Sequence, residues 1–466
     1  MKIKHKELEI PPGDPFKNCQ LQRKKYGDTL TYIVNSYADG FVLALNNEWG
    51  TGKTTFVKMW QQSLKDKGFK TLYFNAWEND FNNDPLVALM SELKTINPNE
   101  DNKTFKSLLT KGAVLTKHLL PGIIKAIAEK YIDSKTITEA IENATKSATD
   151  ILKDEINEYA EKKKGLIEFR DELEKFVKEN SPDKPLIFII DELDRCRPNF
   201  AVEVLEQVKH FFGVTGIVFV ISIDKVQLGN AIKGFYGSEL INSNEYLRRF
   251  IDLEFVIPKP KTELFCNYLF SYFDFDLFFS EERWNIRELA DDKTSFLKFS
   301  AILFDLSNTT LRQQEKIFSL ARLALNSFNV NTYLFPPVFI LLIYIKDFKK
   351  DLFDSITNRT LLPQELIDEI RVFFPKKIDE YDLRYFTGIE ARLVLCYNNY
   401  YREIYRSSEI FEKNLSPPGP ITLLVKSRID DSKFSSDLQT FGSGRISDIS
   451  LKFLLDKINL LDSFSN

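Results

Sequence analysis

Residues 47–54 read Asn-Glu-Trp-Gly-Thr-Gly-Lys-Thr, directly after the apolar run 41–45 and at the start of a helical pattern. A strand, a glycine-rich turn and a helix N-terminus together form a phosphate cradle, because backbone N–H groups converge on an anion that the helix dipole also favours. Lys53 adds a mobile positive charge, and the Thr54 hydroxyl is suited to hold Mg²⁺. The stretch therefore predicts the P-loop of an NTPase.

One position departs from the P-loop pattern G-x-x-x-x-G-K-[ST], because Asn47 stands where the first glycine is expected. Asparagine tolerates a positive φ better than most residues other than glycine. We therefore expect the turn to keep its conformation despite the change.

A second apolar run, 185–190, ends in Asp191 and Glu192. A buried strand that delivers a carboxylate at its C-terminal end is a Walker B arrangement. In that arrangement Asp191 would hold Mg²⁺ through water, and Glu192 would polarise the attacking water as a base. An acidic loop after any strand is the alternative for this pair alone, but the P-loop beside it favours the NTPase interpretation.

Strand and helix patterns alternate along the first part of the chain, with strands expected at 41–45, 70–75, 185–190, 216–223 and 253–257. This alternation implies an α/β fold with a doubly wound, mostly parallel sheet, whose ligand lies at the carboxyl ends of the strands. The two phosphate-site motifs are too far apart for an ordinary loop, so a helical insertion separates them. We expect an NTPase core at 1–96 and 181–260, the insertion at 97–180, a helical lid at 261–363 and a C-terminal helical or mixed domain at 364–466.

The composition bounds the function classes. The 466 residues carry a net charge of −4, so no bulk positive charge indicates nucleic acid or anionic lipid. Four scattered cysteines without a C-x-x-C pair and three histidines do not indicate a zinc site and fit a reducing compartment. The N-terminus shows no secretory pattern, so we expect a cytoplasmic protein.

One segment requires comparison with a membrane span. No charge appears between Arg322 and Lys346, but asparagines and the pair Pro336-Pro337 interrupt the interval. The continuous apolar part, 338–345, is shorter than the roughly 20 residues that a spanning helix needs. We expect a buried core helix and no membrane span.

Three motifs together resemble the KAP family of P-loop NTPases: 47–54, Phe-Asn-Ala-Trp-Glu at 74–78 and Asp-Glu-Leu-Asp-Arg-Cys at 191–196. The likeness covers about residues 14–260. In that family a tryptophan precedes the glycines, the second strand ends in Asn-x-Trp, and the Walker B aspartate opens an Asp-[Asp/Glu]-Leu-Asp-Arg-Cys signature. Glu192 stands where the family often has aspartate, a change that we expect catalysis to tolerate. The resemblance implies ATP and Mg²⁺ as ligands and hydrolysis as the activity.

The resemblance also bears on the helical regions. Many family members carry membrane helices between the two motifs, whereas here the segment from Lys111 to Ile132 is interrupted by charges. It either packs on its own domain as a helical hairpin or contacts a partner or a membrane surface. In the lid, Arg312 is either a sensor arginine or a surface residue. The run 416–420 reads Ser-Pro-Pro-Gly-Pro and predicts a turn or hinge.

Further residues near the predicted site have two interpretations each. Asp224 follows the strand 216–223 and is either a sensor of the γ-phosphate or a helix N-cap, and the two roles are compatible. Arg248 and Arg249 are candidates for an arginine finger, in cis or from a neighbouring subunit, but paired arginines on a helix are also commonly solvated. The residues expected to bind the nucleotide are Asn47, Glu48, Trp49, Gly50, Thr51, Gly52, Lys53, Thr54, Thr55 and Asp224.

The neighbours of the Walker B motif complete the predicted site. Asp194 and Arg195 either tie its loop to other elements or form a structural salt bridge. Trp49 and Trp77 are expected to brace the P-loop by packing. We assign catalysis to Glu192, Lys53, Arg248 and Arg249, and metal binding to Thr54 and Asp191.

Three functions remain open. The first is an ATP-hydrolysing switch for partner proteins, active as an ATP-dependent homo- or hetero-oligomer, in the antiphage defence systems where bacterial family members often occur. The second is a nucleic-acid motor or loader, which the acidic balance and the lack of a basic stripe disfavour. The third is a scaffold that binds nucleotide without turnover, which the intact Lys53, Thr54, Asp191 and Glu192 disfavour.

Overall fold

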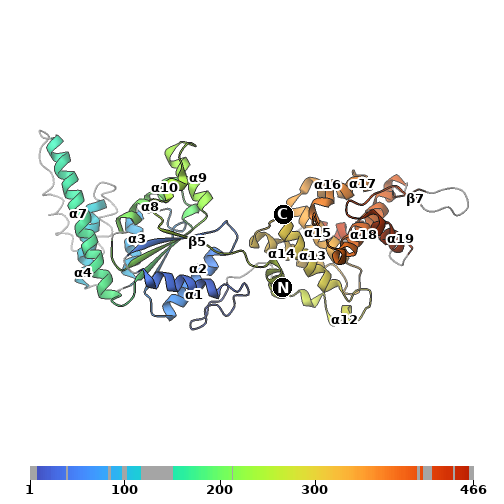
Figure 1. Ribbon diagram of the computed structural model, residues 1–466, viewed down its shortest axis with the longest axis horizontal. Coiled ribbons are helices and arrows are strands. Elements are labelled where there is room, and N and C mark those ends of the chain that lie inside the picture. Colours follow the sequence, from blue (N-terminus) through green and yellow to red (C-terminus); the bar gives the residue numbers. More distant parts are fainter. Residues whose placement is uncertain are drawn as a thin grey trace, which may run out of the picture. The chain divides into compact units, whose positions relative to one another are not determined.

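A computed structural model describes residues 8–37, 40–81, 85–96, 102–116, 151–211, 214–406, 410–412, 422–443 and 447–460. The chain divides into two compact units, Glu7–Lys259 and Pro260–Asn466 (Figure 1). The division falls next to residue 260, where the sequence patterns change from alternating strands and helices to helices alone.

A five-stranded parallel sheet forms the centre of the first unit, in the order β2-β3-β4-β1-β5. Its strands are β1 (Phe41–Asn46), β2 (Thr71–Asn75), β3 (Leu186–Asp191), β4 (Ile217–Ile223) and β5 (Leu253–Val256). β3 and β4 are buried along their whole length, as expected for central strands of a sheet that is covered on both faces. The predicted doubly wound α/β fold is confirmed.

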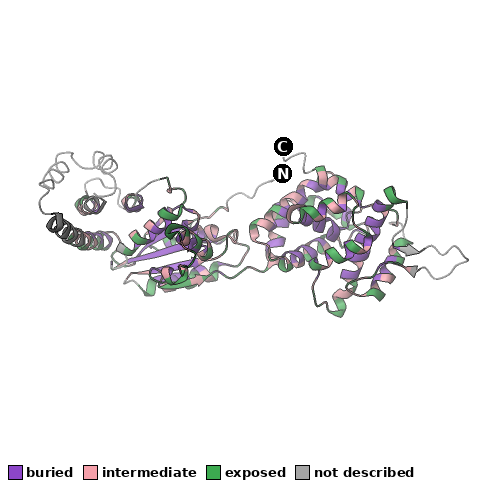
Figure 2. Ribbon diagram, turned by 90° about the horizontal axis from the view of Figure 1, so that it is seen from above, coloured by how far each residue is buried: buried purple, intermediate pink, exposed green. Residues whose placement is uncertain are grey.

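Helices cover both faces of this sheet, so that the strands lie buried between them (Figure 2). One face packs against α1 (Lys24–Ser36) and α2 (Lys53–Asp66), where Phe56 and Trp60 are fully buried. The helices that contribute to the core on the other face are α3 (Pro85–Lys94), α4 (Lys103–Thr116), α7 (Ile151–Asn180), α8 (Pro198–Phe211), α9 (Lys225–Tyr236) and α10 (Ser243–Leu247).

The two described ends of the insertion belong to the same hydrophobic core as the sheet. α4 packs against α7, with the rings of Phe105 and Phe176 5.5 Å apart, and Phe169 and Leu173 are fully buried. These described ends of 97–180 therefore share the hydrophobic core of the sheet. Residues 117–150, and with them most of the segment from Lys111 to Ile132, lie outside the described residues.

The second unit is built from helices and a small hairpin. Its helices are α11 (Thr262–Tyr272), α12 (Glu281–Trp284), α13 (Asp292–Leu306), α14 (Leu311–Leu325), α15 (Pro336–Phe348), α16 (Lys350–Thr357), α17 (Pro363–Ile370), α18 (Glu380–Tyr405), α19 (Asp431–Gly442) and α20 (Lys452–Asn459), and the hairpin joins β6 (Phe411–Glu412) to β7 (Thr422–Leu423). Many of the chain's phenylalanines meet in its core, including Phe270, Phe275, Phe279, Phe296 and Phe318.

The helix α15 lies at the centre of this unit. It is buried from Pro336 to Ile345 and packs against α13, α14, α16 and α18, which confirms the expected core helix. Because α15 and α18 pack together, the expected separation of 261–363 from 364–466 does not appear as a division of the structure. Within the described residues, no helix combines the length and apolarity that crossing a membrane requires. The predicted hinge at 416–420 lies outside the described residues.

Candidate functional site

The loop between β1 and α2 has the backbone of a phosphate cradle. Gly50 and Gly52 adopt φ values of 76° and 78°, which cost a residue with a Cβ atom considerable strain. Gly52 is the N-cap of α2, so the free N–H groups of the first helical turn, from Lys53 and Thr54 onward, open onto the loop. The predicted strand, turn and helix are therefore present at 41–66, with the geometry that favours a bound anion.

The ammonium group of Lys53 lies against the loop. Its Nζ donates hydrogen bonds to the carbonyl oxygens of Asn47 and Glu48, the latter at 3.3 Å. Burial lowers the pKa of Lys53, and the carboxylates of Asp194, Asp224 and Asp191 act in the opposite direction. The structure thus brings the predicted lysine of the P-loop within electrostatic reach of carboxylates from the ends of β3 and β4.

Asp191 ends β3 and is 1% exposed. Its two carboxylate oxygens accept hydrogen bonds from the Tyr73 hydroxyl at 2.9 Å and from the Glu192 backbone N–H at 3.0 Å. Burial, together with the Asp191 carboxylate, raises the pKa of Tyr73, which therefore remains a donor. These bonds fix the carboxylate and leave it lone pairs for the water shell of a metal ion.

The residues present fit Mg²⁺ in the way that P-loop sites use it. Mg²⁺ retains several waters and takes few protein ligands, because substrate phosphates supply the rest. The described residues contain no group of three or more His, Cys, Asp or Glu side chains that would hold a metal alone. Thr54, in the first turn of α2, and Asp191, at the end of β3, would hold the ion together with the phosphates.

Glu192 has φ 61°, a left-handed conformation that is uncommon outside glycine. Its carboxylate pairs with Arg195 at 2.8 Å and accepts a hydrogen bond from Asn75 Nδ2 at 3.3 Å. Burial raises the pKa of Glu192, whereas Arg195 lowers it. A carboxylate with a raised pKa, held by two donors, is suited to accept a proton from water.

Asn75 is held in one orientation by its own surroundings. Its Oδ1 accepts hydrogen bonds from the backbone N–H groups of Trp77 and Glu78, at 3.1 and 3.3 Å, so Nδ2 is left to face Glu192. The indole of Trp77 is half exposed, and the guanidinium of Arg195 lies 5.5 Å from its ring centre. The motif at 74–78 therefore orients the predicted base. From the sequence, we expected only that Trp77 packs against the P-loop.

Trp49 links the two halves of the site directly. Its indole N–H donates a hydrogen bond to the carboxylate of Asp194, which is buried. Burial raises the pKa of Asp194, while the Trp49 hydrogen bond and Lys53 lower it. Of the two interpretations for Asp194, the tie between neighbouring elements is the one observed. Arg195, in contrast, forms a salt bridge within its own loop, to Glu192.

Arg23, which no motif in the sequence singled out, stabilises the P-loop through hydrogen bonds to its backbone. It precedes α1, is 3% exposed, and donates to the carbonyl oxygens of Thr51 at 2.8 Å and Gly52 at 3.1 Å. These bonds hold the peptide units whose N–H groups face the opposite way. An isolated arginine at the start of a helix carries no signal by which its role could have been found.

Asn47 differs from the expectation, because φ is positive in this loop at Gly50 and Gly52 but not at Asn47. Its side chain instead pairs twice with the backbone of Ile257, donating to the carbonyl and accepting from the N–H, both at 2.8 Å. The side-chain amide of Asn47 therefore bonds to Ile257 as a backbone peptide of a neighbouring strand would. In this way it extends the pairing of β1 with β5. The expected conformational reason for Asn47 was wrong.

Asp224 is the N-cap of α9, with its side chain accepting from the N–H groups of Val226 at 3.1 Å and Gln227 at 3.3 Å. The expected cap is thus observed. Asp224 also contributes to the electrostatic field at Lys53, so its role as a sensor stays a prediction.

Arg248 and Arg249 are not brought to the P-loop. They follow α10 and precede β5, whose first residue pairs with Leu43 near the beginning of β1, whereas the P-loop follows the end of β1. Arg248 is exposed and pairs with Glu245 at 2.6 Å, and Arg249 is exposed beside the cavity between α7 and α10. The geometry does not support a finger in cis, and the role in trans stays a prediction.

The model of the KAP family P-loop domain matches residues 23–325. No curated protein matches the chain. Among solved structures, the Aeropyrum pernix ORC2 protein in its ADPNP-ADP complexes is 12% identical, with 99% of this chain and 98% of that chain covered and a TM-score of 0.34. The Aeropyrum pernix ORC1 protein in complex with DNA is 10% identical, covering 98% and 95% of the two chains at a TM-score of 0.33.

We predict that Asn47→Gly and Asn47→Val lose similar stability, about 1–3 kcal/mol, because both remove the two hydrogen bonds to Ile257. Urea unfolding with and without nucleotide measures the effect. If the valine variant alone were strongly destabilised, a positive φ at this position would account for Asn47 instead.

Proposed function

Because the chain belongs to the KAP family of P-loop domains, it is a nucleotide-binding P-loop NTPase, and we propose that it hydrolyses ATP with Mg²⁺ to switch its interactions with partner proteins. One observation carries this proposal. The ammonium of Lys53, the carboxylate of Asp191 and the base candidate Glu192 come together at the carboxyl edge of the sheet, beside a loop shaped by two left-handed glycines.

The chain's own groups account for binding of the triphosphate. The N–H groups of the loop and of the first turn of α2 surround the phosphates, and Lys53 neutralises the outer ones. Mg²⁺, when bound, supplies further neutralisation of the phosphate oxygens. Thr54 and Asp191 would hold the ion, and Tyr73 keeps the Asp191 carboxylate in place.

The proposed base is Glu192, which takes a proton from the attacking water as the water approaches the γ-phosphate. Asn75 and Arg195 hold its carboxylate, and Arg195 also lies beside the half-exposed Trp77. A partner that contacts Trp77 would therefore change the surroundings of the base. This connection supports a switch that partner proteins read and influence, with an ATP-dependent homo- or hetero-oligomer as its working form.

We predict that Lys53→Ala abolishes ATP binding, because Lys53 neutralises the outer phosphates. We also predict that Glu192→Gln preserves binding while turnover falls by about 10²-fold or more, because glutamine cannot accept the proton. Calorimetric titration measures binding, and phosphate release measures turnover. Lys65→Ala, an exposed position on the same helix, is the matched control and should behave as wild type.

Two outcomes would contradict this assignment. Unchanged affinity in Lys53→Ala would remove the P-loop as the nucleotide site. If wild type released no phosphate with any partner and Glu192→Gln were indistinguishable from it, the chain would be a nucleotide-binding scaffold without turnover.

We predict that Arg195→Ala moves the acidic limb of the turnover profile to higher pH. Arg195 lowers the pKa of Glu192, so its removal lets the pKa rise and keeps the base protonated up to a higher pH. Arg195→Lys retains a positive charge and should stay closer to wild type. An acidic limb that does not move in Arg195→Ala would show that another group titrates there. The measurement is kcat against pH at saturating ATP.

The setting that we propose is a bacterial antiphage system in which a separate effector acts downstream, as the family resemblance suggests. We predict that phage plaque counts on cells that express the native operon rise to the empty-vector level with Lys53→Ala, while Lys65→Ala retains protection. Equal protection by wild type and Lys53→Ala would separate the nucleotide site from defence. No protection by the wild-type operon against any phage tested would remove the setting itself.

A further inference from the structure

The second unit holds an arginine that lacks an ordinary partner. Arg392, on α18, lies between the rings of Phe335 and Phe441, with its guanidinium carbon 4.6 and 4.3 Å from their centres. Among the described residues, the guanidinium forms neither a hydrogen bond nor an ion pair. An arginine carries five N–H donors, and a half-buried one is normally bonded to a carboxylate or to carbonyl groups. The two phenyl rings hold the cation but use none of its donors.

A cavity of about 270 Å³ opens beside this guanidinium. Its walls come from α13, from the segment that leads into α15, from α18 and from α19. Arg384 lies about two helical turns before Arg392 on α18. It also lines the cavity, is exposed, and has no side-chain partner among the described residues. The aromatic residues that line the cavity are Tyr333, Phe335, Tyr385 and Phe441. The cavity thus combines two open guanidinium groups with aromatic walls.

The wall opposite α18 is held in place by buried contacts. Arg283 is 1% exposed and donates to the carbonyl oxygens of Val330 and Thr332, the latter at 2.9 Å. Phe335 then adopts φ 49°, a strained conformation for a bulky residue, with its ring stacked on Tyr333 at 6.0 Å. Strain that the surroundings maintain at a cavity wall is typical of sites prepared for a ligand.

The carboxylates near Arg392 are engaged elsewhere. Asp292 bonds to Arg283, and Asp437 accepts a hydrogen bond from the Thr387 hydroxyl at 2.9 Å. Both raise the pKa of Arg392 through their charge, against a larger lowering by burial, but neither makes an ion pair with it. Glu288 also lines the cavity and is exposed. The charge of Arg392 is therefore partly balanced, while its donors remain open.

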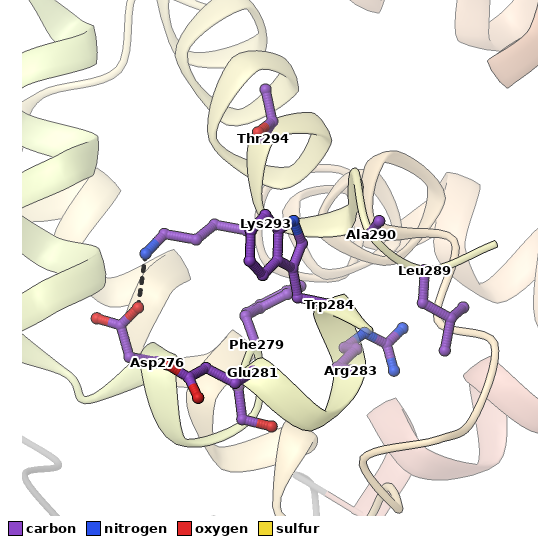
Figure 3. Close-up of a pocket in the computed structure, with 10 residues that line it drawn as sticks. Asp276, Phe279, Glu281, Arg283, Trp284, Leu289, Ala290, Lys293 and Thr294 are labelled. Carbon is purple, nitrogen blue, oxygen red and sulfur yellow. Dashed lines mark hydrogen bonds and ion pairs between the residues drawn. The ribbon is translucent and has the colours of Figure 1, made fainter. Parts of the chain in front are cut away.

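A neighbouring cavity of about 360 Å³ shows the contrast (Figure 3). It shares Leu289 with the first one, and its cations are paired: Lys293 reaches Asp276 at 2.6 Å, and Arg283 is bonded to Asp292. Each of its buried donors is matched within the protein. The cavity at Arg392 differs because its two carboxylates, Asp292 and Glu288, make no hydrogen bond or ion pair with Arg392 among the described residues.

We propose that the cavity at Arg392 binds a small organic anion, with a carboxylate or phosphate on an aromatic or apolar body. The anionic oxygens accept from the guanidinium of Arg392, and Arg384 adds charge at the opening. The body lies against Tyr333, Phe335 and Tyr385. The volume of about 270 Å³ admits a compact metabolite and is near the lower end for small-molecule sites. This site is independent of the nucleotide site in the first unit.

The test is calorimetric titration of the full chain with phenyl phosphate, benzoate and neutral benzamide. We expect saturable binding of one or both anions and none of benzamide, because a planar guanidinium recognises carboxylate and phosphate through paired hydrogen bonds. A preference for phenyl phosphate or for benzoate identifies which oxyanion the natural ligand carries. Arg392→Met keeps an apolar side chain between the two rings and should weaken anion binding by about tenfold or more, with Arg392→Lys intermediate.

Two further variants keep the test decisive. Arg384→Met changes an exposed residue, so the fold should tolerate it, and we expect weaker anion binding even if Arg392→Met does not fold. Arg402→Met, at an exposed position on the same helix α18, is the matched control and should bind as wild type. The proposal is overturned if wild type binds neither anion, if benzamide binds equally well, or if the pocket variants that fold bind as wild type. Arg392 would then be a structural cation that balances Asp292 and Asp437.

Discussion

The parallel register of β1, β3 and β4 is the constraint on which the site depends. Asp191 pairs with Ser222, and Asn46 pairs with Ile223, so three strands end at the same level and deliver their loops to one edge. In a strand, a slip of one residue turns every side chain to the opposite face. Such a slip in β3 would move Asp191 away from Lys53 and exchange its apolar side chains between the two core clusters on either face of the sheet. The burial of both faces of β3 therefore fixes the position of its catalytic end.

Around this edge, hydrogen bonds between polar groups hold the P-loop and the Walker B carboxylates in place. Arg23 and Lys53 bond to carbonyl oxygens of the P-loop, Trp49 joins the loop to Asp194, and Tyr73 fixes Asp191. Buried polar groups are costly unless they are bonded, so each of these contacts also secures its partner. The result is a loop whose shape is determined before a nucleotide arrives, which reduces the ordering that binding requires.

The sequence was sufficient to predict the strands, the P-loop, the Walker B pair and the core helix α15, because each of these depends on a local pattern of a few residues. Arg23, Tyr73 and Asn75 were not assigned their roles, since their partners lie on other elements and only the folded chain brings them together. Asn47 shows the same limit. The sequence shows Asn47 as a departure from the P-loop pattern. The reason is its pairing with Ile257, which follows β5 and is distant in the sequence. Arg248 and Arg249 were predicted as a possible arginine finger from their place in the chain, and the connection from β4 to β5 does not bring them to the P-loop.

The pairing of Asn47 with Ile257 has a mechanical consequence. Ile257 is the residue after β5 and lies directly before Pro258 and Pro260, where the second unit begins. Prolines restrict their own φ and the conformation of the residue before them, so this exit from the sheet is stiff. The first residue of the P-loop is therefore joined by two hydrogen bonds to the residue that precedes this conformationally restricted segment. Asn47 is thus held by the residue with which the chain leaves the sheet.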